Sequence, residues 1–340
     1  MEEINSWLVG GGLAVGAVFA IALQRYRFCL VAGVSNLLLI KDSRQALAFA
    51  AALLVAITGT QLLEILDIVA IADSYYRNSS LDWFGAAVGG FVFGVGATLA
   101  GGCAARTLVR TMEGSLHSLI VLVSFAVMAA IVQFGFLESF RIALSHATTI
   151  ELTTDAGIAA LLSLPPWLVV VVVATLLLLF IYKSWLRCPD KTMLAVGFMV
   201  GALVVLSWYI TGVLAQDEFM PASPSAMTLS GPLARFGYML ISGRVPALSF
   251  AVSFVIGTAV VSLLLALAMG QFRIVKPARG MIKTALLGGA LMGTGAIMAY
   301  GCNIGQGLSG LSTLSLESLI AAVGMVAGIS MVTRWMEKYG

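Results

Sequence analysis

Charged side chains are scarce in this 340-residue chain, because Lys, Arg, Asp and Glu together make up only 10% of it. A soluble domain usually carries about 25%, so the chain has too few charges to cover a water-exposed surface. The formal net charge is only +3, and the basic residues occur in short clusters between apolar runs. We therefore exclude nucleic-acid binding.

Cysteine and histidine are also few. The four cysteines, Cys29, Cys103, Cys188 and Cys302, are far apart and form no Cys-x-x-Cys pair. This spacing excludes a zinc knuckle or a thioredoxin-like redox site and makes a disulfide framework unexpected. The two histidines have no neighbouring ligand set, so we expect neither a metal nor a cofactor.

A secretory signal peptide is missing as well. The start, Met1 to Asn5, is acidic where a signal peptide is basic, and no small-residue cleavage site follows the first apolar run. We expect that run to remain as a transmembrane helix.

Apolar residues are abundant, at 60% of the chain with a mean hydropathy of +1.02. A helix needs about 20 apolar residues to cross a bilayer. Nine stretches meet this length: 7–24, 45–66, 84–101, 116–137, 165–182, 191–210, 246–269, 284–300 and 316–333. Four others, 28–40, 103–112, 228–241 and 303–314, are too short to span. The sequence predicts an all-α polytopic membrane protein with nine transmembrane helices and four short re-entrant ones.

Basic residues predict the orientation, since cytoplasmic loops hold the excess of Lys and Arg. With the N-terminus outside, 15 of the 19 basic residues lie inside. The four outside are Arg77, Arg141, Arg235 and Arg244. We expect a multi-pass protein of the inner (plasma) membrane with an external N-terminus and a cytoplasmic C-terminus.

An internal repeat links the two halves of the chain. Residues 89–103 (GGFVFGVGATLAGGC) and 288–302 (GGALMGTGAIMAYGC) are identical at eight of fifteen positions. The copies lie five spans apart, and an odd number reverses their direction through the membrane. We predict one transmembrane domain, 1–340, made of two inverted repeats of about 7–164 and 165–333, with a substrate site where the halves meet.

Both copies end in Gly-Cys followed by a break in the helix, at Gly102-Cys103 and at Gly301-Cys302. Such breaks are tolerated inside a membrane where they face protein or a wet cavity, and the N-terminus of the following short helix attracts anions. We therefore expect two facing rims of backbone N–H groups, each carrying a thiol, with Cys103 opposite Cys302.

Other residues have two readings. Cys29 follows a basic segment at the end of the first span and is either a ligand or a small apolar filler. Arg106 either attracts anions or anchors the cytoplasmic side. The glycines of the repeat fit close helix packing. Cys188 lies in a short loop between Arg187 and Pro189, and we interpret it as incidental.

The segments GGCAARTLVRTMEG (101–114) and GCNIGQGLSGLSTLS (301–315) resemble the paired signatures of the YeeE/YedE family of sulfur transporters. The resemblance extends over nearly the whole chain. It implies an hourglass of nine long and four short helices in which Cys29, Cys103 and Cys302 contact thiosulfate through weak S–H contacts. Asn303 and Gln306 belong to the second signature, and we include both among the candidate substrate-binding residues.

The resulting hypothesis is a transporter, and not an enzyme, that takes up thiosulfate or a related small sulfur anion. We expect the thiols to remain protonated, because thiolates would repel an anion. Arg106 replaces a small residue common in thiosulfate-uptake members, which implies an effect on substrate choice. Any TusA-like sulfur carrier is expected to be a separate cytoplasmic protein.

Three alternatives remain at this point. A sulfur relay would form persulfides or a disulfide at Cys103 and Cys302 and pass sulfur to a carrier. A selenium-compound transporter fits the YedE side of the family. A purely structural membrane subunit would leave the paired Gly-Cys breaks unexplained.

Overall fold

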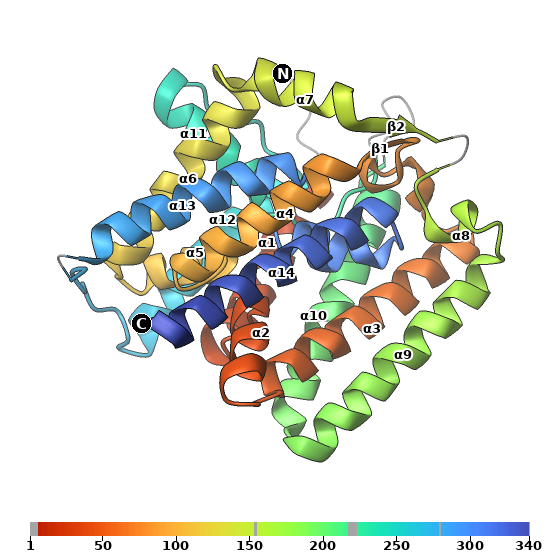
Figure 1. Ribbon diagram of the computed structural model, residues 1–340, viewed down its shortest axis with the longest axis horizontal. Helices are drawn as coiled ribbons and strands as arrows, with labels where there is room; N and C mark the ends of the chain where they lie inside the picture. Colours follow the sequence, from red (N-terminus) through yellow and green to blue (C-terminus); the bar gives the residue numbers. More distant parts are fainter. Residues whose placement is uncertain (1–5, 153–154, 217–222, 279, 340) are drawn as a thin grey trace.

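Long helices dominate the computed structural model, which describes residues 6–152, 155–216, 223–278 and 280–339 (Figure 1). Within these residues nine helical segments are long and apolar enough to cross a membrane, which confirms the predicted all-α polytopic class. Their long helices are α1 (Ser6–Arg25), α3 (Arg44–Ile65), α4 (Trp83–Leu99), α6 (Leu116–Phe134), α9 (Pro166–Arg187), α10 (Lys191–Tyr209), α12 (Phe250–Ala268), α13 (Met281–Met298) and α14 (Leu316–Tyr339).

The predicted boundaries are close to the observed ones except at two C-termini. Helix α9 continues to Arg187 and α14 to Tyr339, beyond the predicted ends at 182 and 333. The added turns contain charged residues such as Lys183 and Arg334. A helix needs no apolar surface once it leaves the hydrocarbon, and long basic side chains reach the interface from there.

Three of the four short segments are regular helices: α2 (Leu30–Leu39), α5 (Ala104–Met112) and α11 (Ser230–Ser242). The fourth, expected over 303–314, is instead a π-helical stretch, η4 (Gly305–Gly310). Three of its six residues are glycine, the residue that least favours a regular helix apart from proline. A π-helical stretch is often found at functional sites.

Several small elements were not predicted. They are the helices α7 (Glu138–Thr148) and α8 (Ile158–Leu161), the 3₁₀ turns η1 (Ile71–Asp73) and η2 (Tyr75–Arg77), the π-helical end of α10, η3 (Ile210–Leu214), and the strands β1 (Ser80–Asp82) and β2 (Thr149–Glu151). The strands pair antiparallel, with Leu81 opposite Ile150. Helix α7 has no buried residue and lies along one edge of the bundle (Figure 1). These elements are too short or too polar for a search based on membrane-spanning length.

The long helices pack in matching combinations. Helix α1 lies against α12 and α10 lies against α3, while α4 lies against α14 and α13 lies against α6. Helices α4 and α13, which carry the two copies of the repeated sequence, also pack on each other. Each copy therefore has the same kinds of neighbour.

Two equivalent glycines show how close these contacts are. A Cβ atom at Gly94 would collide with the carbonyl oxygen of Met325 on α14, and one at Gly293 would collide with that of Phe125 on α6. Small residues let membrane helices approach until their backbones touch. The glycine pattern of the repeat therefore serves helix packing.

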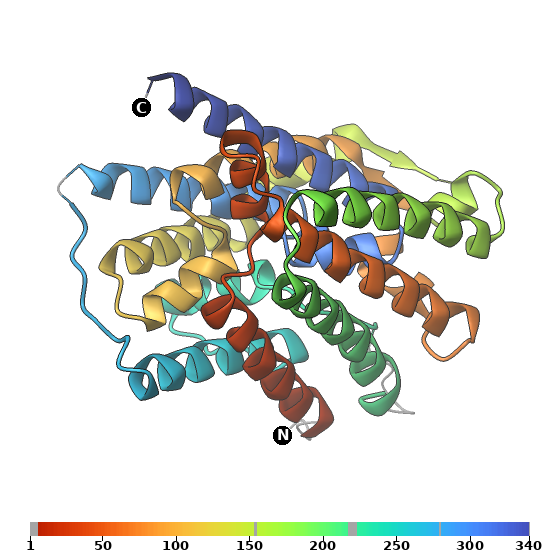
Figure 2. The same ribbon diagram turned by 90° about the horizontal axis from the view of Figure 1, so that it is seen from below.

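Helix α9 shows the opposite environment. It packs on α3 at the edge of the bundle (Figure 1), and Leu176, Leu178 and Leu179 on it are exposed. Such a continuous apolar exposed face fits hydrocarbon and not water. Figure 2 shows the first turn of α1 and the last turn of α14 on opposite sides of the bundle, as an odd number of spans requires.

Candidate functional site

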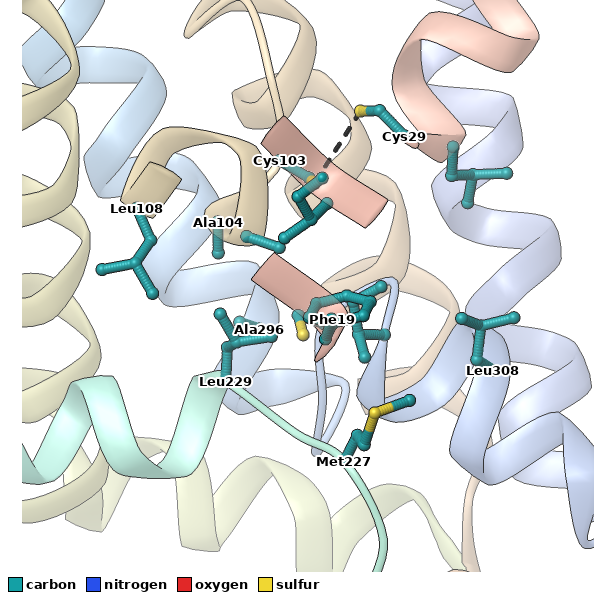
Figure 3. Close-up of a cluster of buried hydrophobic side chains, with 14 of the residues drawn as sticks. Phe19, Cys29, Cys103, Ala104, Leu108, Met227, Leu229, Ala296 and Leu308 are labelled. Carbon is teal, nitrogen blue, oxygen red and sulfur yellow. Dashed lines mark hydrogen bonds between the residues drawn. The ribbon is translucent and has the colours of Figure 1, made fainter. Parts of the chain in front are cut away.

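Two of the three candidate cysteines are in contact. Cys29 immediately precedes α2 and Cys103 immediately precedes α5, each with an extended backbone. Their Sγ atoms are 3.8 Å apart, and Figure 3 shows the two side chains pointing toward one another. Only 4% of Cys29 and 1% of Cys103 is exposed, so the thiol pair lies inside the bundle.

Cys302 occupies the matching break after α13. It is fully buried and belongs to the same apolar cluster as Cys29 and Cys103. Its sulfur makes no hydrogen bond to either of them in the described part of the chain. The direct thiol contact is therefore Cys29 with Cys103, and the predicted placement of Cys103 opposite Cys302 stays a prediction. In the second half the position matching Cys29 falls near Ile210, which supplies no thiol.

The two breaks share one backbone turn. Gly101 takes a left-handed conformation with φ +75°, and its counterpart Tyr300 does so with φ +52°. After them the amides of Gly102 and Gly301 donate to the carbonyls of Ala97 and Ala296, at 2.9 and 2.8 Å. These two N–H groups are thus bonded within the protein, and a role of Gly102 and Gly301 in binding an anion stays a prediction.

Because Gly102 and Gly301 have no side chains, the side chains of Arg106 and Gln306 can lie close to the two turns. A Cβ at Gly102 would lie 3.2 Å from Cγ of Arg106, and a Cβ at Gly301 would lie 2.8 Å from Cγ of Gln306. The second contact is the tighter, and it also involves the backbone nitrogen of Gln306 at 3.1 Å. Arg106 and Gln306 therefore approach the two turns in a similar way, although the repeat aligns Arg106 with Gly305.

Gln306 is fully occupied by bonds within the protein. Its Nε2 donates to the carbonyl of Ala299 at 2.8 Å, and its Oε1 accepts from the hydroxyl of Ser318. It braces the turn through these two bonds. Asn303 differs, since it is 1% exposed and neither Oδ1 nor Nδ2 finds a partner in the described residues. A buried amide without partners is rare in native proteins and calls for a functional reason.

Arg106 is half-buried beside the thiol pair. Its Nη1 donates to the carbonyl of Leu23 at 2.9 Å, and the neighbouring Arg110 donates to the carbonyl of Gly101 at 3.1 Å. No carboxylate in the described chain pairs with either guanidinium. Both cations are therefore free to attract an anion.

Two cavities lie at opposite ends of the bundle. The first, which we name the inner cavity, has a volume of about 540 Å³ and is lined by Cys29, Gly102, Arg106 and Arg110 among others. The outer cavity measures about 530 Å³ and is lined by Arg141, Arg235, Tyr75, Thr228, Ser230 and Tyr300 among others.

Helix α1 runs from one cavity to the other, so its length gives their separation. It contributes Leu8, in its first turn, to the outer cavity, while Arg27, just past its last turn, lines the inner one. Twenty helical residues rise about 30 Å. Cys103 and Cys302 line neither cavity and lie in the buried cluster. The two cavities are therefore separated by a buried cluster that contains both of these thiols.

Sequence reasoning missed the segment between α3 and α4. Tyr76 on this segment is 3% exposed and packs edge-on against Trp208, with ring centroids 6.1 Å apart. Burial raises the pKa of the Tyr76 phenol well above its usual range, and Tyr75 and Cys302 act in the same direction. The available signal was the run of apolar residues in a loop flanked by charges, among them Val69, Ile71 and Tyr76, which the structure shows to be buried.

Arg77 holds this segment in place. Its guanidinium bonds the carboxylate of Glu64 at 2.6 and 2.9 Å and that of Asp155 at 2.6 Å. The Arg77 side chain is only 10% exposed, and charge-assisted bonds of this length are strong and directional. Glu64 therefore has a structural partner at the end of α3.

The sequence matches the Sulphur transport family over residues 25–331. This chain belongs to that family. It is 27% identical to the thiosulfate transporter TsuA of Escherichia coli K12 over 342 residues, which cover 95% of this chain and 93% of the relative. It is also 27% identical to the thiosulfate transporter TsuA of Spirochaeta thermophila, over 94% of this chain and 97% of that protein. Both relatives are named as transporters.

Proposed function

We propose that this chain is a membrane transporter that takes up thiosulfate through the constriction containing Cys29, Cys103 and Cys302. The observation that carries the proposal is the pair of similar cavities at opposite ends of the bundle, separated by the buried thiols. The names of both relatives support the choice of substrate. Sulfur is a weak hydrogen-bonding partner, so thiols can replace part of the hydration of the anion without halting its passage.

The proposal includes two inverted halves in one transmembrane domain. It is supported by the matching helix neighbours, by the equivalent packing glycines Gly94 and Gly293, and by the shared turn at the two Gly-Cys breaks. A further match links Leu116, which donates to the carbonyl of Val275, with Leu316, which donates to that of Ala156. Inverted halves place a site near the midplane.

The orientation follows from the basic residues. Arg27, Arg106 and Arg110 line the inner cavity, which we place on the cytoplasmic side of the inner membrane, with the N-terminus outside. Arg279, which counts toward the same side, lies outside the described residues. A separate TusA-like carrier would receive the sulfur compound at this face.

The test is growth on thiosulfate. Cells that lack other sulfur uptake routes are supplied with thiosulfate alone, with and without this chain, and entry of labelled thiosulfate is measured in parallel. Growth and uptake are expected only with the chain. Absence of both, with the protein abundant in the membrane, contradicts the proposed function.

A sulfur relay is a second candidate, favoured by the direct contact of Cys29 with Cys103. Substitution of Cys103→Ser separates the two functions. A relay needs sulfur nucleophilicity and would lose all activity, whereas a transporter keeps a fraction of its uptake through hydroxyl contacts. A complete loss of uptake in a folded Cys103→Ser variant favours the relay.

A further inference from the structure

Two buried polar side chains near Cys302 have no partner. The first is Asn303, in which both side-chain polar atoms are unsatisfied, and the second is Tyr76, whose hydroxyl makes no hydrogen bond with any described residue. The ring of Tyr75 packs on that of Tyr76, with 3.9 Å between the ring centroids. Leaving such groups unsatisfied destabilises a fold, so both positions retain a cost that an apolar residue would avoid.

Asn303 and Tyr76 lie on two segments that meet at Gly305. Asn303 lies two residues before Gly305, and a Cβ at Gly305 would lie 3.7 Å from the Tyr76 hydroxyl and 2.8 Å from Oγ1 of Thr228. The glycine therefore lets the chain just after Asn303 pack closely on the threonine hydroxyl and beside the phenol. Thr228 also lines the outer cavity, so this contact adjoins that cavity.

The chemistry of this place differs from that of the inner thiol pair. Tyr76 offers an O–H donor and Asn303 offers two N–H donors, both neutral and both buried. Cys29 and Cys103 offer only weak S–H contacts. Thiosulfate has the same division, with a terminal sulfur at one end and three oxygens at the other.

We infer that Tyr76 and Asn303 form the subsite for the oxygen end of the transported anion, at the outer side of Cys302. The inference rests on the proposed function and assigns the substrate class. That class is small anions carrying both a sulfonate-type oxygen group and a terminal sulfur. The oxygens bind the phenol and the amide, while the sulfur end meets the thiols.

The experiment uses the full chain in proteoliposomes with Tyr76→Phe and Asn303→Leu. Both variants remove hydrogen-bond donors while keeping similar volume, and Tyr182→Phe, at an exposed phenol on α9, is the matched control. We expect the KM for thiosulfate uptake to rise at least tenfold in each variant with little change in kcat. Thermal unfolding without ligand is expected at the same or a higher temperature, and the upward shift of the melting temperature with thiosulfate is expected to shrink.

The KM and the melting temperature together distinguish a ligand-binding role from a structural one, because loss of a structural group would lower the melting temperature. A wild-type KM and a wild-type thiosulfate-induced shift in both variants would overturn the inference and leave the proposed function intact. If either variant is too unstable to purify, the other decides. Failure of the wild-type chain to carry thiosulfate would overturn both proposals.

Discussion

The turn before Cys103, which we call the inner turn, and the turn before Cys302, the outer turn, share one backbone conformation but continue differently. After Cys103 the chain enters a regular helix, Arg106 lies beside the turn, and a second cation, Arg110, donates to the Gly101 carbonyl in it. After Cys302 it enters a π-helical stretch and the turn is supported by a neutral amide, Gln306. On the proposed path, an anion meets neutral groups at the outer turn and positive charge at the inner one. The difference makes the two ends of a nearly symmetric scaffold chemically distinct.

The largest expected effect comes from removing the thiol that follows either turn. We expect Cys103→Ala and Cys302→Ala each to reduce thiosulfate uptake by about a hundredfold or more, because both thiols lie in the constriction that the anion must cross. Labelled uptake at equal membrane abundance is the measurement. Cys188→Ala, at the end of α9 away from the cluster, is the control and should transport normally. Full activity of either constriction variant would remove the thiol mechanism.

The two supporting glycines sharpen the comparison. Gly301→Ala is expected to destabilise the protein by about 1–3 kcal/mol, because the new methyl group meets both the side chain and the backbone of Gln306. Gly102→Ala is expected to change stability by less than about 1 kcal/mol, because Arg106 is flexible and loss of a glycine restricts the unfolded chain. Melting temperatures in detergent test the difference, and equal shifts for the two variants would contradict it.

The charge at the inner turn should have a smaller effect. A unit charge near the path contributes about 1 kcal/mol where screening is strong, so Arg106→Gln is expected to lower uptake roughly fivefold. High salt should reduce the difference in thiosulfate uptake between the variant and the wild type. Arg44→Gln removes an exposed cation paired with Asp42 and serves as the control. An equal loss in both variants would mean that Arg106 has no special role at the site.

The sequence predicted some parts of the site and missed others for identifiable reasons. Cys103 and Cys302 were recognisable because they end the two copies of the repeat at equivalent positions. Cys29 has no repeat counterpart, and its contact with Cys103 joins residues 74 positions apart. The bonds of Gln306 to Ala299 and Ser318 are a tertiary feature that the sequence did not indicate, and its predicted contact with substrate stays a prediction. Tyr76 lies in a loop and has no motif of its own.

The nine spans, the glycine-lined contacts and the Gly-Cys breaks were determined by the sequence alone, because each depends on local composition and on the length needed to cross hydrocarbon. Only the tertiary structure decided which thiols touch, which amides are already used, and which polar groups remain unpaired. Those outcomes depend on how distant segments such as 66–82 and 303–310 pack together. No local pattern of residues specifies that packing.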